Sequence, residues 1–299
     1  MMSGEAATHR GKNHGGTLRR ALFGQHGAAP MNTVPDSEQA SPRRFGIPTA
    51  ASEILSVFKN ADEMKQHPDY VAAKAGENAA AARFITDVAS AETFAQARDR
   101  WPGATFVPVI ALEASGANAI PSQFAEALAA AANGDTETEI IQVNQPFHTG
   151  ANPMDRVISR PLFDGPVEFG KSYVLIDDAT VLGGTLAELA NHIQEGGGKV
   201  VGLAVLANAS RAGLLSPATT HVTLAERRFG NVLRNEIGVE PGALTGPEAG
   251  YLAGFKDADA LRARIAKAKR ERSERLRAKS IRPSEDESGL DQPGATRLA

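Results

Sequence analysis

The chain has 299 residues, of which 42% are hydrophobic and 5% aromatic, enough for one large domain or two small ones with a mainly aliphatic core. Its formal net charge of -3 gives no bulk attraction to nucleic acid or to an anionic membrane, and its lack of cysteine excludes disulfides, zinc–thiolate sites and a thiol nucleophile. No apolar run approaches the roughly 18 residues of a membrane-spanning helix, so we expect a cytoplasmic protein with no membrane partner.

The first 50 residues are rich in Gly, Pro, Ser and charged residues and show no periodicity. Such a composition predicts a disordered N-terminal extension over 1–50. Translation starts either at Met1 or at Met31, and the sequence leaves both open. A folded domain is predicted over 51–255, followed by a tail over 256–299 that is basic and helical and then disordered.

Hydrophobic periodicity predicts the elements of this domain. The spacing of Ile54, Leu55 and Phe58 predicts a first helix, and small and apolar residues at helical spacing predict another over 68–88. Apolar runs then predict strands at 105–111, 139–143, 172–176 and 199–206, with helices over 123–132, capped by Ser122, and over 185–194, ended by the glycines 196–198. This alternation predicts an α/β fold with a doubly wound parallel sheet, a helical N-terminal part and a C-terminal helical tail.

The last third is less regular. Residues 219–224 fit one more strand, and Thr245 with Glu248 three residues on forms a capping-box pattern at the start of a helix. Over 262–282 there are ten Lys or Arg against two Glu. A solvated helix is the favoured interpretation of this stretch, and a basic arm that binds RNA or DNA stays open.

The segment 173–186, YVLIDDATVLGGTL, carries the clearest chemistry. An apolar strand ends at Asp177 and Asp178, and a short loop with two glycines leads into a helix. In a parallel sheet the ligand crevice lies at the carboxyl ends of the strands. Backbone amides ahead of a helix N-terminus bind phosphate, and carboxylates accept hydrogen bonds from a vicinal diol. The pattern therefore indicates a ribose 5-phosphate site, with a plain strand-to-helix turn capped by acids as the alternative.

This segment resembles the phosphoribosyl-pyrophosphate signature of the type I phosphoribosyltransferases, and the resemblance extends over about 70–255. It is carried by YVAAKAG, EASGANAIP, HTGA, FDGPVEFGKSYVLIDDATVLGGTL and LTGPEAGYL. The family commonly has hydroxyl residues where Val181 and Leu182 stand here, so two contacts to the phosphate are missing. The phosphoribosyl-binding residues that the resemblance implies are Asp177, Asp178, Ala179, Thr180, Val181, Leu182, Gly183, Gly184 and Thr185.

The resemblance also implies functional roles for two further loops. The loop after the first core strand contacts pyrophosphate in this family, which implies roles for Glu113, Ser115, Gly116 and Asn118; a turn held by its own side chains stays open. The segment 142–170, which contains the long irregular stretch 144–170, sits where the family has its catalytic hood. There His148, Arg156 and Arg160 are equally well explained as phosphate ligands or as exposed surface residues. For Lys74, a solvated side chain is favoured over a ligand contact.

Taken as a whole, the resemblance implies a pentosyltransferase of nucleotide metabolism. It would transfer a 5-phosphoribosyl group from phosphoribosyl pyrophosphate to an unidentified acceptor, expected to be a nitrogenous base, and release pyrophosphate. Asp177, Asp178, His148 and Arg156 would be its catalytic residues. Mg²⁺ would be held mainly through ligand oxygens and water.

The expected partner is thus a small-molecule substrate, and a homodimer stays open. The alternative function is a non-catalytic sensor of a phosphoribosyl ligand or nucleotide, with nucleic acid as a further partner through 262–282. A third hypothesis is an accessory protein of a mobile element that keeps the fold for interaction only, and the presence of both acids, Gly183 and Thr185 argues against it.

Overall fold

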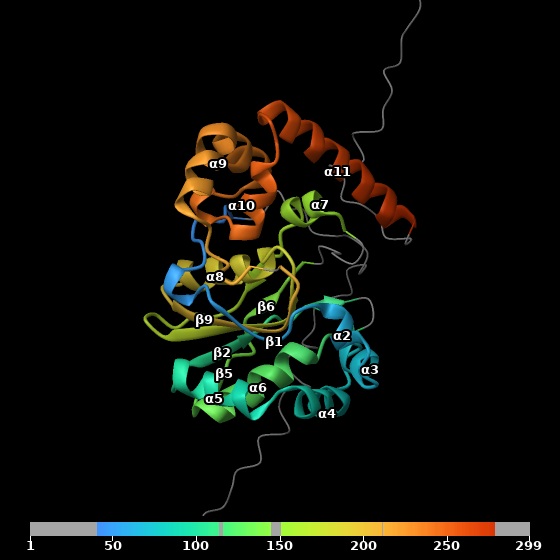
Figure 1. The fold of residues 1–299 in the computed structure, drawn as a ribbon, viewed down its shortest axis with the longest axis vertical. Coiled ribbons are helices and arrows are strands. Elements are labelled where there is room, and N and C mark those ends of the chain that lie inside the picture. Colours follow the sequence, from blue (N-terminus) through green and yellow to red (C-terminus); the bar gives the residue numbers. More distant parts are fainter. Residues whose placement is uncertain (1–40, 114–115, 145–150, 211, 279–299) are drawn as a thin grey trace, which may run out of the picture. The chain divides into compact units, whose positions relative to one another are not determined.

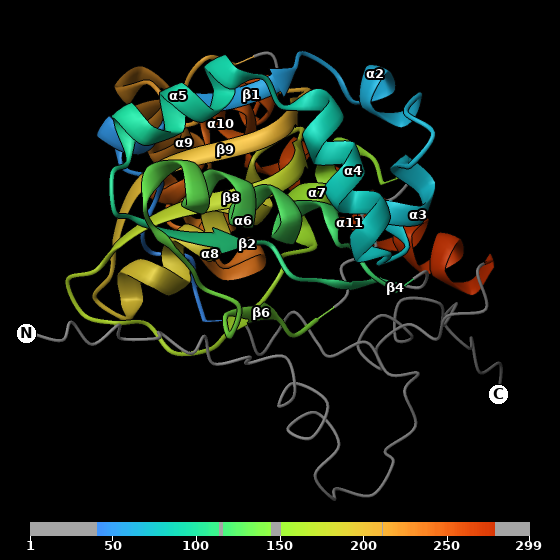
Figure 2. The same cartoon turned by 90° about the horizontal axis from the view of Figure 1, so that it is seen from below.

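The computed structural model describes residues 41–113, 116–144, 151–210 and 212–278, all of which belong to one compact unit of the chain. Their centre is a five-stranded sheet with the order β1-β9-β8-β2-β5, in which every neighbouring pair is parallel (Figures 1 and 2). The strands are β1 Ile54–Phe58, β2 Thr105–Pro108, β5 Asp135–Thr136, β8 Ser172–Thr180 and β9 Lys199–Asn208.

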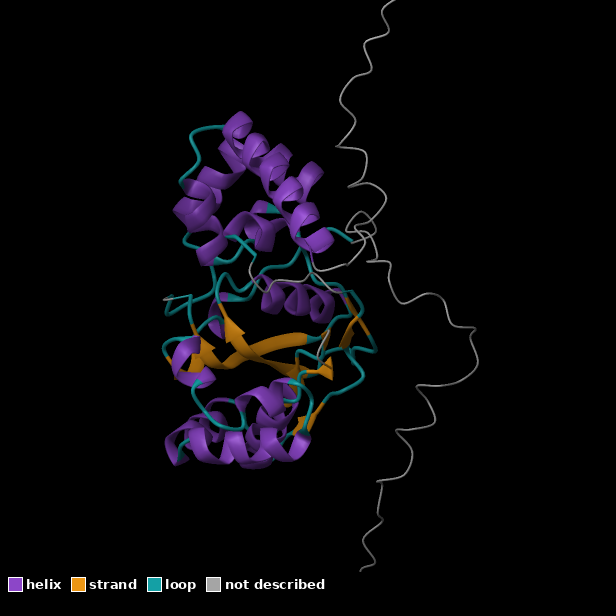
Figure 3. Ribbon diagram, turned by 90° about the vertical axis from the view of Figure 1, so that its right-hand side faces the viewer, coloured by secondary structure: helices purple, strands orange, loops and turns teal. Residues whose placement is uncertain are grey.

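Helices cover both faces of this sheet (Figure 3). Alternate side chains of a strand point to opposite faces. Val174 and Ile176 of β8 therefore pack in a core with α4 Asn78–Val88, α5 Ala91–Arg100 and α6 Ile120–Ala132. Tyr173 and Leu175 face the other way and pack with α8 Gly184–Glu195. The predicted mixed α/β fold with a parallel sheet is confirmed.

A third core joins the C-terminal helices. Met154, Phe229, Leu252 and Leu261 are buried together in it. Its elements are α7 Pro153–Ile158, α9 Thr219–Val232, the π-helical turn η3 Leu233–Ile237, the 3-10 turn η4 Pro241–Ala243, α10 Gly246–Ala253 and α11 Ala258–Ala278. The strand predicted at 219–224 is wrong. Thr and Val at the start of α9 favoured a strand locally, but Ala225, Phe229 and Val232 at helical spacing bury one face of a helix.

Two antiparallel pairs flank the main sheet. β3 Leu112–Glu113 pairs with β4 Gly116–Ala117, and β6 Ile141–Gln142 pairs with β7 Phe163–Asp164. The strand predicted at 139–143 is therefore wrong as a member of the parallel sheet. β5 forms the sheet edge instead, and the chain beyond it turns away to pair with the segment before Gly165.

The N-terminal part also differs from its prediction. Ile54, Leu55 and Phe58 lie on strand β1, because this segment pairs with β9 along its length. It is followed by α2 Ala61–Lys65 and preceded by the turn η2 Thr49–Ala51. The helix predicted over 68–88 is two helices, α3 Tyr70–Lys74 and α4, because the chain turns at Gly76 with φ 99°.

The predicted ends and caps of three helices are confirmed in part. α8 begins one residue before Thr185 and ends at Glu195, where Gly197 takes the left-handed conformation. The capping box of Thr245 and Glu248 is present. Ser122 is not an N-cap: α6 begins at Ile120, whose backbone N–H donates to the Asn118 side chain.

Residues 41–50, placed in the extension by the sequence, contact the folded unit. Arg43 is 2% exposed and forms a parallel bridge with Val239. The domain boundaries at 50 and 255 stay predictions. No helix in the described part of the chain combines the length and the apolarity needed to cross a membrane.

Candidate anion-binding site

A small hollow lies where β8 ends and α8 begins. Its volume is about 50 Å³. Roughly 10–15 Å³ suffices for one water by the same measure, so the hollow can take several waters or one small oxyanion. The residues that line it are Arg156, Asp177, Ala179, Thr180, Val181, Leu182, Gly183, Gly184 and Thr185.

The loop is shaped by Gly183. Its φ of 79° is left-handed, and a Cβ there would lie 2.9 Å from the Leu215 side chain, so glycine is required for both reasons. Gly183 is the N-cap of the twelve-residue helix α8 and has no side chain to cap it, and no other described side chain is found to accept a hydrogen bond from the first amides of α8. The first amides of α8 are thus available to an anion, which the helix dipole also favours.

Thr180 adds a hydroxyl to the hollow. The residue is 3% exposed, and its Oγ1 has no hydrogen-bond partner among the described residues. A buried polar atom without a partner costs about 1–3 kcal/mol of stability. A ligand in the hollow that forms a hydrogen bond with Thr180 Oγ1 would remove this destabilisation.

Arg156 reaches the hollow from α7. Its guanidinium is half-buried, and burial lowers its pKa, an effect that the carboxylate of Asp155 partly offsets. Within the described part of the chain no carboxylate forms an ion pair with it. A partly desolvated cation is therefore directed at the same small space as the α8 amides, which suits an anionic ligand.

The two acids differ in their surroundings. Asp178 accepts hydrogen bonds from Lys74 Nζ at 2.6 Å and Asn118 Nδ2 at 2.9 Å, so its charge is already compensated. The interpretation of Lys74 as a solvated side chain is wrong. Asp177 lines the hollow and accepts the backbone N–H of Asp178. Burial, and then the neighbouring Asp178 charge, raise the pKa of Asp177 well above its usual range.

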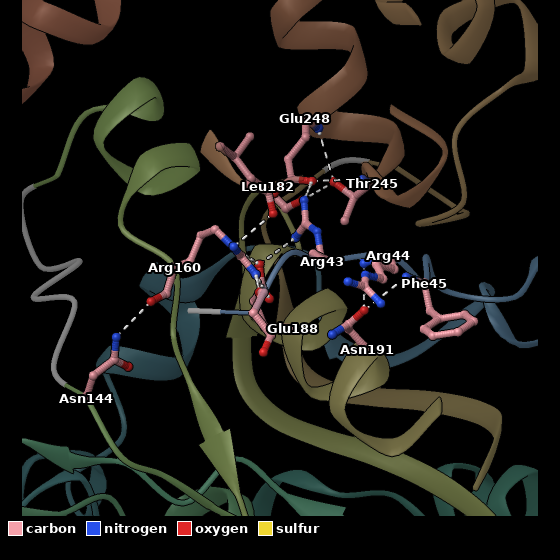
Figure 4. A network of polar contacts seen from close by, with 12 residues as sticks. Arg43, Arg44, Phe45, Asn144, Arg160, Leu182, Glu188, Asn191, Thr245 and Glu248 are labelled. Atoms are coloured by element: carbon pink, nitrogen blue, oxygen red, sulfur yellow. Dashed lines mark hydrogen bonds and ion pairs between the residues drawn. The ribbon is translucent and has the colours of Figure 1, made fainter. Parts of the chain in front are cut away.

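A set of buried ion pairs supports the far side of the loop (Figure 4). Arg43 Nη2 lies 2.6 Å from Glu248 Oε2, and Arg43 Nη1 lies 3.4 Å from Glu188 Oε1. Arg160 donates to both carboxylate oxygens of Glu188, at 2.7 and 2.8 Å. We call these four residues the charge cluster. Arg160 is thus committed to a buried structural pair, which fits neither of the two interpretations left open for it, a phosphate ligand or an exposed surface residue.

The charge cluster is joined to the loop through α10. Glu248 accepts the backbone N–H of Thr245, and Thr245 Oγ1 donates to the carbonyl of Leu182 at 2.5 Å. A Cβ on Gly184 would lie 3.0 Å from Glu248 Oε1. The capping box is the only part of this network that has a local sequence pattern; the roles of Arg43 and Glu188 have none.

The structure brings only part of the predicted site together. Asp177, Ala179 and residues 180–185 line one hollow with Arg156. Asn118 holds Asp178. Glu113 and Gly116 form the β3–β4 pair. Ser115 and His148 lie outside the described residues, so their roles stay predictions.

Comparison with known proteins gives two similarities, and no family model matches the chain. It is 34% identical over 238 residues, 76% of its length, to Protein TraN of Escherichia coli, and 31% identical over 129 residues to an uncharacterized protein of Haemophilus influenzae. The chain spans 52% of the first relative's length and 29% of the second's.

This finding corrects the predicted function. The long match is to Protein TraN, and neither relative bears the name of a phosphoribosyltransferase. The expected transfer of a phosphoribosyl group from phosphoribosyl pyrophosphate, and with it the classification as a transferase of nucleotide metabolism, is wrong. The hollow lined by residues 179–185 remains a candidate anion-binding site.

Proposed function

We propose that this chain binds the phosphate group of a small phosphorylated molecule in the loop 180–185. The observation that carries the proposal is the buried Thr180 hydroxyl, which lies beside a helix N-terminus; among the residues that the structure describes, the hydroxyl has no hydrogen-bond partner and the terminus has no side-chain cap. Successive backbone amides at such a terminus hold phosphate oxygens, and Arg156 supplies a cation from α7.

Val181 and Leu182 do not prevent this binding. Leu182 packs with the C-terminal helices and gives its carbonyl to Thr245, while Val181 is 41% exposed. Both side chains are apolar, so neither takes the place of an anionic ligand in the hollow. The phosphate contacts would come from the amides and from the hydroxyls of Thr180 and Thr185.

Asp177 favours a ligand that also carries hydroxyl groups. Its raised pKa keeps the carboxyl neutral to a higher pH, and a neutral carboxyl both donates and accepts hydrogen bonds. Next to a phosphate it would therefore bind a sugar hydroxyl with little charge repulsion. A type I phosphoribosyltransferase-like fold is part of this proposal, supported by the parallel sheet with the acids at the carboxyl end of β8.

The residues present do not fit a metal ion held by the protein. No group of three or more metal-ligating side chains occurs among the described residues. Asp178 is compensated by Lys74, and the raised pKa of Asp177 opposes the charged form that Mg²⁺ needs. A Mg²⁺ carried by the ligand's own oxygens stays a prediction, and no step depends on it.

Isothermal titration with ribose 5-phosphate, inorganic phosphate and ribose tests the proposal. Binding should follow the phosphate: ribose 5-phosphate should bind most tightly, inorganic phosphate more weakly, and ribose alone should give no heat. Arg156→Ala should lower the affinity for both phosphate-containing ligands. Arg228→Ala, which changes an exposed arginine on α9, should leave both affinities unchanged. Equal affinity for ribose and ribose 5-phosphate would contradict the proposal.

A further inference from the structure

Helix α7 brings Arg156 to the hollow, but it is too short to hold its own position. It has six residues, Pro153–Ile158, whereas an isolated helix needs roughly 12–15 residues to be even marginally stable in water. Its place beside the start of α8 is therefore set by its contacts with other elements. Arg156 is the only residue of α7 that lines the hollow, so these contacts decide where its guanidinium lies.

The basic helix α11, which lies next to α7, supplies polar contacts to it (Figure 1). Asp155 is fully buried and accepts hydrogen bonds from Arg275 Nη1 and, at 2.8 Å, from Ser159 Oγ. One turn earlier on α11, Glu271 accepts a hydrogen bond from Asn152 Nδ2 at 2.8 Å. Asn152 is the N-cap of α7. These contacts fix both the start of α7 and the direction in which its first turn faces.

The direction of Asp155 also determines the direction of Arg156. Adjacent residues on a helix do not face each other, so Asp155 faces α11 while Arg156 faces the hollow. A rotation of α7 about its axis would move both side chains together. The buried pair of Asp155 and Arg275 opposes such a rotation, because the rotation would leave a buried carboxylate without its cation.

The same pair keeps Asp155 from drawing Arg156 away from the hollow. The carboxylate is already compensated, since Arg275 contacts it and Arg272 Nε lies 4.0 Å from its Oδ1. The pKa of Arg156 is lowered first by burial; Asp155 raises it, and the positive charge of Arg275 lowers it again. Arg275 therefore repels Arg156, which leaves the Arg156 guanidinium available to an anion on the other side of α7.

We propose that Asp155 and Arg275 are positioning residues of the anion site, which act through Arg156 and do not touch the ligand. This inference rests on the proposed phosphate site. The ion pair between α11 and α7 holds the Arg156 guanidinium at the hollow. The C-terminal half of α11 is thereby required for anion binding, although none of its described residues lines the hollow.

A double-mutant cycle separates positioning from a general structural role. Arg275→Gln should raise the Kd for inorganic phosphate several-fold, and Arg156→Ala should raise it about tenfold, as expected for one lost charge-assisted hydrogen bond. The double variant should bind no more weakly than Arg156→Ala, because Arg275 acts only through Arg156. Arg275→Lys keeps the cation and should recover most of the affinity. Arg262→Gln, the matched control on α11, breaks surface pairs with Glu236 and Asp259 and should bind as wild type does.

Two outcomes of this cycle would overturn the proposal. One is wild-type affinity in Arg275→Gln, and the other is a double variant in which the two losses multiply. If Arg275→Gln does not fold, the variant Asp155→Asn with Arg275→Gln takes its place, because it leaves neither member of the pair as an unpaired buried charge.

The position of Arg156 can also be measured without a ligand. Arg156 and residues 180–185 line the same small hollow, so nuclear Overhauser contacts between them should be present in the wild-type protein. These contacts should be lost in Arg275→Gln and kept in Arg262→Gln. Contacts that persist in Arg275→Gln would refute the positioning role. If the contacts are lost as expected but wild type binds no phosphate, the positioning role stands and the proposed function is wrong.

Discussion

The two sides of the loop 180–185 differ in how their polar groups are satisfied. On one side the charge cluster pairs every carboxylate with a guanidinium, and only Nε of Arg43 lacks a partner. On the other side, Thr180 has no partner, α8 has no side-chain cap and Arg156 has no ion pair among the described residues. The paired side stabilises the fold, and the unpaired side is ready for a ligand.

This contrast leads to opposite expectations for substitutions. A change in the charge cluster should lower stability, because it leaves a buried charge without compensation. A change that removes an unpaired group should leave stability equal or higher and weaken ligand binding.

The largest effect is expected for Arg43→Ala. It leaves Glu248 buried without its cation and should lower the free energy of unfolding by about 3–5 kcal/mol, measured by urea denaturation. Arg234→Ala is the matched control, since Arg234 also pairs with two carboxylates but on the surface. That change should cost far less stability, because water already screens the exposed pairs. Equal losses for the two variants would mean that the charge cluster does not support the fold.

Gly183→Ala should affect both stability and binding. The left-handed conformation costs a residue with a Cβ about 1–2 kcal/mol, and relief of that strain would move the α8 amides. Gly170→Ala is the control, because Gly170 has φ 77° but no atom within 4 Å of the added Cβ. Gly183→Ala should lose more stability than Gly170→Ala, because its Cβ also meets Leu215, and only Gly183→Ala should lose affinity for phosphate. A similar loss of affinity in Gly170→Ala would point to a global effect.

Thr180→Val should change protein stability and phosphate affinity in opposite directions. Valine keeps the shape of threonine and removes the unpaired hydroxyl, so the free protein should gain about 1 kcal/mol of stability while phosphate affinity falls by a similar amount. Thermal unfolding and titration measure the two effects. Thr223→Val, on the exposed face of α9, should change neither. A Thr180→Val protein that is less stable than wild type would mean that the hydroxyl has a partner within the protein.

Local sequence patterns were sufficient to predict the elements at the centre of the main sheet, and they were not sufficient to predict the strand at its β1 edge. Apolar runs and flanking glycines predict the positions of β8, α8 and β9 within 172–206, but β8 continues past its predicted end at 176, through both acids, to Thr180. The residues Ile54, Leu55 and Phe58 fit one helical face as well as they fit a strand. Their strand character comes from pairing with β9, in which Ile54 lies beside Leu203. Such a distant contact leaves no trace in local spacing.

The same limit applies to the candidate site. The motif located the loop, because glycines and acids between a strand and a helix have a local cause. Arg43 pairs with Glu248 across 205 positions of sequence, and it lies in a stretch whose composition indicated disorder. Arg156 and Arg160 were equivalent by composition, and only the fold shows that one lines the hollow and the other pairs with Glu188.

The smallest effect is expected at Asp177, and it depends on pH. Burial and the Asp178 charge raise the pKa of Asp177 above its ordinary value of 3.8. A raised folded-state pKa means that its stabilising contribution is present below the unfolded value and is lost as pH rises through the folded value. Asp177→Asn stays neutral throughout. It should therefore lose less stability than wild type as pH rises across this window.

Binding should show the same linkage. An anion in the hollow opposes the charged carboxylate, so binding takes up a proton and wild-type affinity should increase as pH falls. Sulfate is the better probe, because phosphate itself titrates with a pKa of about 6 for its second proton. Asp177→Asn should bind sulfate with an affinity that changes less with pH. If wild type and variant have parallel pH profiles, then Asp177 does not face the bound anion, and the hollow takes its ligand in another orientation.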